Sequence, residues 1–184
     1  MNHMDDLIES YSRFVKLPWP KMLAPAQRVW MAVYSPNEER RLRLHLPAFE
    51  TATRAAGYNW EQIEIAGEFE KWMAGHDYAD AYFNKPELLK TALPGFFEYL
   101  AETVITQIDQ KATETTIFGL VGASSLYGLG PSVKVSALVE KIEDHVPGRL
   151  LVFFPGEVEG NNFRLMGAQD GWNYHAVIIS AEGN

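Results

Sequence analysis

A glycine- and serine-rich loop, residues 122–130, is the part of the chain whose residue types come nearest to a reactive site. Glycine lets backbone N–H groups approach an anion where a helix begins, and serine hydroxyl groups offer further donors. The loop lacks the G-x-x-x-x-G-K-[ST] pattern of a P-loop, because Lys134 comes too late in the chain. We favour a tight strand-to-helix turn whose serines bond to nearby backbone groups. The candidate anion-binding residues are Gly122, Ser124, Ser125 and Gly128.

A serine of this loop would need a neighbouring base and a third, orienting group to act as a nucleophile. The motif G-x-S-x-G does not occur, and none of the five histidines has a recognisable hydrolase spacing to Ser124 or Ser125. His175 lies within an expected strand, where a hydrogen-bonded structural histidine is the ordinary explanation. We therefore assign no catalytic residue.

Two groups of ionisable side chains invite interpretation as a metal site or an acid–base pair. Residues 76–80 hold one histidine and two aspartates, but a metal centre needs at least three convergent ligands and a second shell. Acidic residues near the positive end of a helix explain this group as well. Glu157, Glu159 and Asp170 fall in expected loops, where exposed acids are common, whereas acid–base catalysis needs carboxylates in a cleft. We expect neither a metal site nor a cofactor.

Aromatic side chains near the C-terminus are better suited to binding a partner. Trp and Tyr dominate the energetics of protein interfaces, and open α/β sheets meet their ligands beyond the carboxyl ends of the strands. The alternative is that Trp172 and Tyr174 pack an edge hairpin against a helix. The residues that we assign to a partner-binding surface are Ser125, Tyr127, Glu157, Trp172 and Tyr174.

Apolar runs predict the strands that must position these side chains. Unbroken apolar runs are typical of parallel strands covered on both faces, and alternation is typical of half-buried strands. The C-terminal runs 163–166 and 174–179, joined by 167–171, are expected to form an antiparallel hairpin. The other strands are predicted at 29–34, 59–65, 116–121 and 150–154.

Helical spacing predicts the intervening segments. Ser35 and Glu38 match a capping box, and Pro47 is expected to kink or interrupt the helix that follows. Helices are predicted at 4–17, 36–56, 67–110 with breaks near Gly75, Pro86 and Pro94-Gly95, and 135–145. The order of elements predicts a three-layer α/β sandwich with a mostly parallel sheet and a C-terminal antiparallel hairpin at one edge.

Length and composition fit one α/β domain over residues 1–184, in which 1–27 form an N-terminal helix and a proline-rich connector. The fractions of hydrophobic residues (47%) and charged residues (22%) are those of an ordinary globular protein. The absence of cysteine excludes disulfides and thiolate chemistry. No apolar run is long enough to span a bilayer, and acids stand where a signal peptide needs bases. These features predict a cytoplasmic protein.

The net charge of −8 is concentrated in residues 61–145, which carry 6 basic and 14 acidic side chains. Such a segment repels phosphate backbones, so we expect no direct binding of nucleic acid. A basic patch is available only on the first third of the chain, at Arg40, Arg41 and Arg43. We favour the interpretation that these arginines and Arg54 pair with acids of their own helix, which are Glu38, Glu39 and Glu50.

Three stretches of the chain carry a resemblance to a known family. They are residues 152–157 with Gly160, Leu165 and 172–176, then the turn 121–127, and the strand and helix start at 32–39. Together they resemble the BrxB family of BREX bacteriophage-exclusion systems over roughly residues 28–180. His175 and Met166 depart from the family pattern, which has arginine and phenylalanine at these places.

The resemblance implies a small intracellular accessory protein that works beside PglZ-like and other BREX subunits, and it carries no catalytic residues. We therefore expect a non-enzymatic assembly component of a phage-defence complex, bound to proteins and not to membranes. The alternative is a nucleotide- or phosphate-binding regulatory enzyme that uses the loop 122–130.

Overall fold

Unbroken apolar runs form the centre of a parallel sheet in the computed structural model, which describes residues 3–168 and 171–183. The strands of this sheet are β1 (Val29–Tyr34), β2 (Asn59–Glu64), β3 (Thr116–Val121), β4 (Arg149–Glu159) and β7 (Val177–Ile179). Their order is β2-β3-β4-β1-β7, and every neighbouring pair runs in parallel. The predicted α/β fold with a mostly parallel sheet is confirmed.

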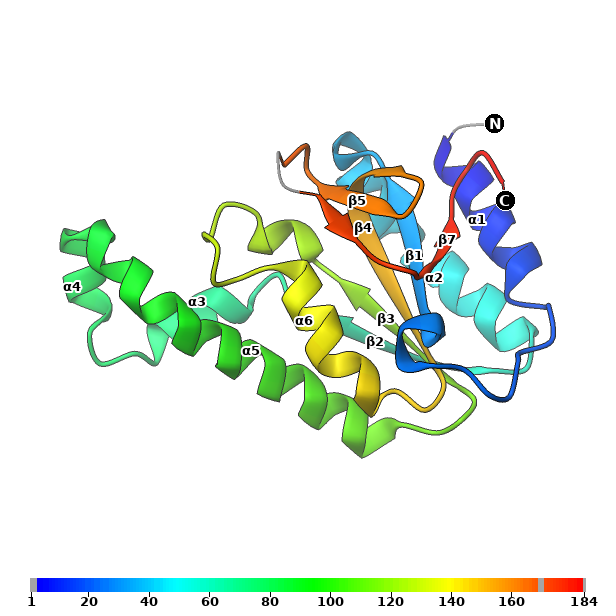
Figure 1. The fold of residues 1–184 in the computed structure, drawn as a ribbon, viewed down its shortest axis with the longest axis horizontal. Helices are drawn as coiled ribbons and strands as arrows, with labels where there is room; N and C mark the ends of the chain where they lie inside the picture. The colour runs from blue at the N-terminus through cyan, green and yellow to red at the C-terminus, as the bar shows by residue number, and fades with distance from the viewer. Residues whose placement is uncertain (1–2, 169–170, 184) are drawn as a thin grey trace.

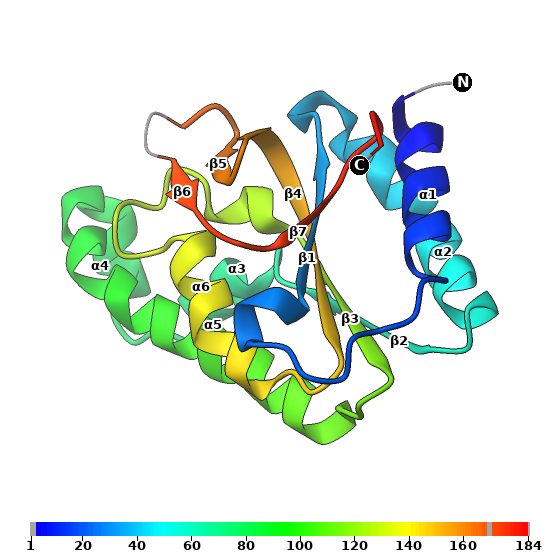
Figure 2. The ribbon, with the colours of Figure 1, turned by 45° about the vertical axis from the view of Figure 1, so that its right-hand side comes forward.

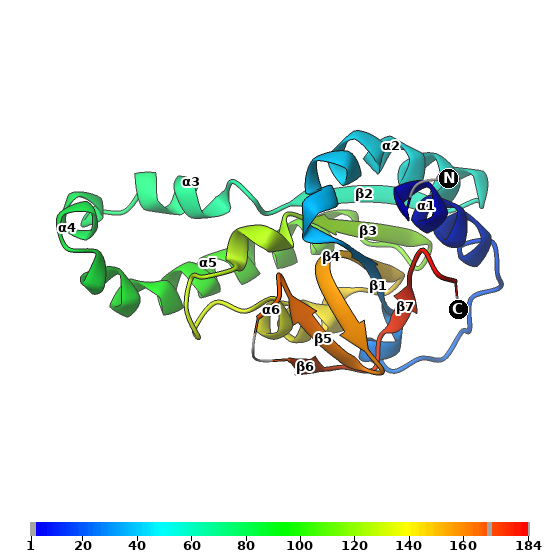
Figure 3. The same ribbon diagram turned by 90° about the horizontal axis from the view of Figure 1, so that it is seen from above.

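Helices cover both faces of the sheet, as Figures 1 and 3 show. One face is covered by α1 and α2, and the other by α5 and α6. A layer of helices on each face of the sheet explains why β1, β3 and most of β4 are buried throughout. The helices are α1 (His3–Phe14), α2 (Glu39–Ala55), α3 (Glu68–Ala74), α4 (Ala79–Asn84), α5 (Leu89–Lys111) and α6 (Val135–Ile142).

The alternation of side chains along β1 divides the core into two parts. Odd-numbered residues from Val29 to Val33 pack in the cluster beneath α5 and α6, and even-numbered residues from Trp30 to Tyr34 pack beneath α1 and α2. Gly119 in β3 leaves room for the indole of Trp60 on the face of the sheet that α1 and α2 cover, because a Cβ atom at Gly119 would lie 2.6 Å from that ring.

Part of the helical layer projects beyond the sheet. Figure 3 shows α3, α4 and the first part of α5 extending away from the strands, and we call residues 68–92 the arm. Apolar side chains remain exposed on it, namely Tyr78, Phe83 and Leu88.

The helices depart from prediction at three places. Pro47 does not interrupt α2 and Pro94 does not break α5, because both prolines lie on exposed helix faces where water can satisfy the freed carbonyl groups. Breaks near Gly75 and Pro86 are confirmed. The capping box is wrong, since the Ser35 side chain makes no capping bond and a 3-10 turn, Pro36–Glu38, precedes α2.

The C-terminal strands form a small antiparallel extension of β4. β4 continues past Pro155 and Gly156, which we had expected in a loop, and pairs with β5 (Asn162–Leu165). β5 then pairs with β6 (Trp172–Asn173), so an antiparallel hairpin is present, but its second strand is not the predicted 174–179. Residues Val177–Ile179 leave this hairpin and join β1 in parallel as β7. A three-residue apolar run fits either pairing, so its partner could not be read from the sequence.

Candidate functional site

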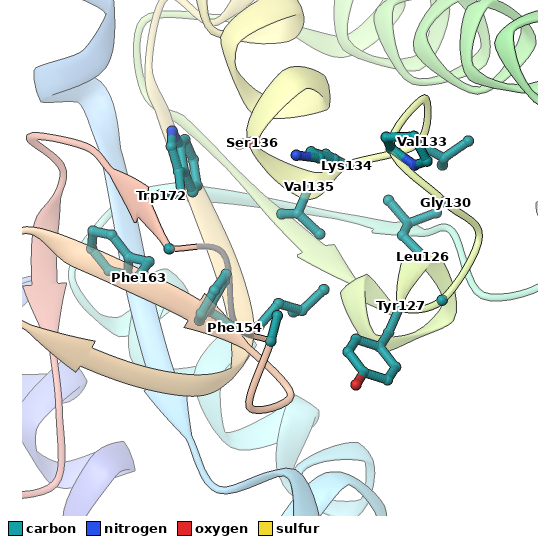
Figure 4. A pocket seen from close by; sticks show the side chains of 15 residues that line it. Leu126, Tyr127, Gly130, Val133, Lys134, Val135, Ser136, Phe154, Phe163 and Trp172 are labelled. Atoms are coloured by element: carbon teal, nitrogen blue, oxygen red, sulfur yellow. The ribbon is translucent and has the colours of Figure 1, made fainter.

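A cavity of about 450 Å³ opens at the carboxyl end of the sheet, and we call it the carboxyl-end pocket. One wall comes from β4, β5 and β6, and the other from residues 126–136, which connect β3 to α6. Figure 4 shows Phe163 and Trp172 facing Leu126 and Val135 across it. A cavity of this size lies in the range of small-ligand and side-chain pockets.

Aromatic packing builds the first wall. Phe163 stands edge-on to Phe154, with ring centroids 5.6 Å apart, and its centroid lies 5.9 Å from that of Trp172. Phe163 and Phe154 are almost completely buried. Gly156 permits this packing, because a Cβ atom there would lie 2.0 Å from the carbonyl oxygen of Arg164 in β5. Only glycine therefore allows β5 to pass so close to β4.

The second wall begins with a sharp turn after β3. Gly122 has a φ of 96°, a left-handed conformation that favours glycine, and it leads into the 3-10 turn Ala123–Leu126. The Ser125 hydroxyl donates to the Gly122 carbonyl oxygen at 2.7 Å, as expected for a serine that satisfies local backbone. The turn directs Leu126 into the pocket, where Val133 and Val135 complete an aliphatic surface.

Few polar groups face the carboxyl-end pocket. Lys134 is the one charged side chain among its described lining residues, and it is exposed. Tyr127, 51% exposed, stands at the mouth. The pocket therefore offers an apolar interior with a cation and a phenol at its rim, which suits an apolar group that carries a negative charge beside it.

The position of β6 is held by two hydrogen bonds to the helical layer. Trp172 Nε1 donates to Glu140 Oε1 at 3.1 Å, and the Tyr174 hydroxyl donates to Glu143 Oε2. The rings of Trp172 and Tyr174 are in contact, with centroids 4.3 Å apart. Burial, together with the Glu143 carboxylate, raises the pKa of the Tyr174 hydroxyl well above its usual value.

The structure brings together some of the residues predicted for a partner surface and separates others. Tyr127 and Trp172 both line the carboxyl-end pocket, and so does Gly128. Ser125 is partly buried in the turn, Glu157 is exposed on β4 opposite Arg164, and Tyr174 is a core residue. Sequence reasoning missed Phe163 and Lys134. Phe163 could have been found from the short apolar alternation in β5, but nothing in the pattern around Lys134 indicates a pocket.

The loop considered for anion binding has a carboxylate beside it. A Cβ atom on Gly122 would lie 2.4 Å from Glu64 Oε1, so the Glu64 carboxylate already occupies that space. Glu64 Oε1 accepts the backbone N–H of Ala66 at 2.9 Å, which fixes its position. The Glu64 charge opposes a second anion at this turn. Gly122, Ser124 and Ser125 lie outside the described lining of the carboxyl-end pocket.

The arginines of α2 are largely engaged with acids. Arg43 contacts Glu64 at 2.6 Å and Glu39 at 3.1 Å, and its pKa is raised, first of all by its hydrogen bond to Glu64. Arg41 pairs with Glu38 at 3.4 Å. Arg54 pairs with Glu50 at 2.9 Å, and Arg40 is exposed. The expected pairing is therefore present for Arg41, Arg43 and Arg54, whereas Arg40 has no ion pair with a described acid and Arg43 also binds Glu64 of β2.

The other reactive groups do not assemble within the described ranges 3–168 and 171–183. No three His, Asp or Glu side chains there lie close enough to hold a metal ion. His76 Nδ1 accepts the backbone N–H of Tyr78, and His175 lies within 3.2 Å of Asn161 Nδ2. Asp170, which was considered with Glu157 and Glu159, lies outside the described residues.

The chain matches no protein-family model, no curated protein and no solved structure. None of the helices in the described part of the chain has the length and apolar character needed to cross a bilayer.

Proposed function

We propose that the protein is a non-enzymatic assembly component of a cytoplasmic BREX-type phage-defence complex and that it binds another subunit, such as a PglZ-like protein. The carboxyl-end pocket is the observation that carries this proposal. Its interior is aromatic and aliphatic, and it lies at the edge of the sheet where α/β folds most often meet their ligands. The resemblance of the chain to the BrxB family supplies the identity of the complex.

The chemistry of the pocket specifies the kind of partner segment. Phe154, Phe163 and Trp172 accept a large aliphatic or aromatic side chain, because such groups gain most from leaving water in an aromatic pocket. Lys134 at the rim favours a carboxylate next to that side chain. The occupant is therefore a segment of the partner with one apolar anchor and a carboxylate next to it.

The decisive variant removes the two rings that the partner segment would contact. Tyr127→Ala with Trp172→Ala is expected to weaken binding to a PglZ-like protein by about tenfold or more, since buried aromatic contacts dominate interface energy. Binding is measured by calorimetry, and folding is checked by circular dichroism. The matched control is Tyr78→Ala on the arm, an exposed tyrosine away from the pocket, which should bind like the wild type.

Unchanged affinity in the double variant would overturn the placement of the interface. If the protein bound no BREX subunit but bound ATP or GTP specifically, and if Ser124→Ala abolished that binding, the alternative function at the loop 122–130 would be supported instead.

A further inference from the structure

A second cavity, of about 400 Å³, lies at the opposite end of the sheet. It is bounded by the connector that follows α1 and by the first residues of β1, β4 and β7, and Figure 2 shows that connector passing the amino ends of the strands. We call it the amino-end pocket. The residues used in the argument are Leu17, Trp19, Trp30 and Arg149, all of which line it.

Arg149 is a buried cation that has no acidic partner in the described part of the chain. Only 4% of the residue is exposed, yet no carboxylate of the described residues lies within ion-pairing distance of its guanidinium. The guanidinium donates to the carbonyl oxygens of Gly148 at 2.9 Å and Pro20 at 3.2 Å. A guanidinium has five N–H donors, so several remain for another acceptor. A buried charge left without an opposite charge is costly, and a bound anion would offset that cost.

Aromatic rings hold the Arg149 guanidinium in place. Its central carbon lies 4.5 Å from the centroid of Trp19 and 5.9 Å from that of Trp30. Cation–π contacts of this kind fix the orientation of the guanidinium plane and leave its edge free to bind a planar anion. The indole N–H of Trp19 is also buried and has no acceptor among the described residues. Arg149 therefore keeps unused N–H donors at the pocket, and Trp19 holds a further donor that has no acceptor among the described residues.

A second arginine adds positive charge nearby. Arg28 donates to the carbonyl oxygens of Val146 at 3.0 Å and Leu23 at 3.2 Å, and it too has no ion pair with a described acid. Burial, and then the Arg28 charge, lower the pKa of the Arg149 guanidinium. In a chain of net charge −8, two neighbouring cations whose hydrogen bonds to the described residues go only to backbone carbonyls are an unusual arrangement. Their combined field attracts an anion.

A purely structural role accounts for only part of these observations. The bond from Arg149 to Pro20 ties the connector to β4, and one N–H group is enough for that purpose. It does not explain the cavity beside the guanidinium, the second unpaired arginine or the orphaned indole N–H. An anion-binding site explains the cavity and the two arginines.

We propose that the amino-end pocket binds a small organic oxyanion with an apolar body, and that the Arg149 guanidinium grips the charged group while the tryptophans and Leu17 enclose the body. A carboxylate and a phosphate share this chemistry, since both accept two parallel N–H bonds from arginine. This site is distinct from the carboxyl-end pocket and does not depend on the function proposed for it.

The test uses the full-length protein with phenylacetate and phenyl phosphate as probes and phenylacetamide as the neutral control. Trp19 and Trp30 line the pocket, so binding is read from tryptophan fluorescence and confirmed by calorimetry. We expect saturable binding of at least one acid and none of the amide. The stronger binder of the two acids identifies the charged group as a carboxylate or a phosphate.

Two variants locate the site. Arg149→Met keeps an apolar stem and removes the cation, and it should weaken binding by about tenfold or more, as loss of a charge-assisted bond does. Leu17→Glu, at a residue that is 56% exposed, leaves the fold intact and places a competing carboxylate at the edge of the pocket. It should weaken binding even if Arg149→Met does not fold. Lys16→Met removes an exposed positive charge outside the described pocket lining and should bind like the wild type.

Failure of both acids to bind at about 10 mM would overturn the proposal, because affinity weaker than this is not specific recognition. Equal binding of phenylacetamide would also overturn it. So would wild-type affinity in a folded Arg149→Met protein or in Leu17→Glu.

Discussion

The two ends of the sheet carry pockets of similar size that place their positive charge differently. At the carboxyl end, Lys134 is exposed at the rim of an interior built from Phe154, Phe163 and Trp172. At the amino end, Arg149 is buried and lies against the rings of Trp19 and Trp30. Both ends combine aromatic rings with one cation, but only the amino end has removed that cation from water.

This difference determines what each pocket can discriminate. An exposed lysine on a flexible stem is solvated and adds little affinity, so recognition at the carboxyl end depends on apolar burial. A buried guanidinium in a fixed orientation binds tightly only an anion whose charged group matches its geometry. The carboxyl-end pocket therefore suits the side chains of a macromolecular partner, and the amino-end pocket suits a particular small anion.

The largest expected effect comes from removing a ring of the carboxyl-end wall. Phe163→Ala deletes a side chain that is 1% exposed and should lower the free energy of unfolding by about 3 kcal/mol, through lost burial and the cavity left behind. The measurement is denaturation by urea. Phe83→Ala, at a residue that is 73% exposed on α4, is the matched control and should change stability by less than about 0.5 kcal/mol.

The same variant tests whether the two ends are independent. Phenylacetate should bind folded Phe163→Ala with wild-type affinity, because Phe163 is not among the described lining residues of the amino-end pocket. If Phe163→Ala lost no more stability than Phe83→Ala, Phe163 would not be the buried side chain described here. If Phe163→Ala lost phenylacetate binding, the two ends of the sheet would be coupled.

A medium effect is expected from exchanging the two cation types. Arg149→Lys keeps the charge but loses the planar fork, so phenylacetate affinity should fall by roughly tenfold. Lys134→Arg should alter partner affinity by less than about twofold, because exposed charges contribute little. Calorimetry measures the affinity of both variants. Normal phenylacetate binding by Arg149→Lys, or a strong change in partner affinity in Lys134→Arg, would contradict the difference described between the two cations.

The smallest expected effect is a dependence of stability on alkaline pH. Burial and Glu143 raise the pKa of Tyr174 in the folded protein above its unfolded value near 10, so the stability from the protonated hydroxyl is complete below pH 10 and is lost as the pH rises further. Between pH 8 and pH 10.5, the difference in unfolding free energy between wild type and Tyr174→Phe should shrink by about 0.8 kcal/mol. A constant difference would mean that Tyr174 ionises normally.

The same pH range should leave the amino end unchanged, because an arginine stays protonated throughout it. Phenylacetate should therefore bind the folded protein equally well at pH 8 and pH 10. A titration of binding over this interval would point to a different anchoring group.

The layers of the fold were predictable from local patterns, because strands such as 116–121 are apolar without interruption only when helices cover both faces. The partner of β7 was not, since three apolar residues carry no information on direction. Gly156 was misread as a loop residue because its requirement comes from β5, which passes over it. Sequence patterns report on neighbours a few residues away, and these features depend on distant ones.

The two pockets were even harder to predict from local sequence patterns, because each is built from residues far apart in the chain. Tyr127 and Trp172 could be suspected as contact residues from their type and position after strands, but their meeting with Phe163 depends on the hairpin register. Arg149 at the start of β4 had no visible importance, because the ring that stacks on it belongs to Trp19, far away along the chain. A lone arginine before an apolar run does not indicate a buried charge.

The length of α5 determines how far the arm projects from the sheet. Its 23 residues make a rod about 34 Å long, and only its later part packs on the sheet, beside α6 (Figures 1 and 3). The exposed aromatic side chains of Tyr78 and Phe83 at the end of the arm therefore lie away from the sheet. A tether or fluorescent label attached at that tip would leave both openings of the molecule unobstructed.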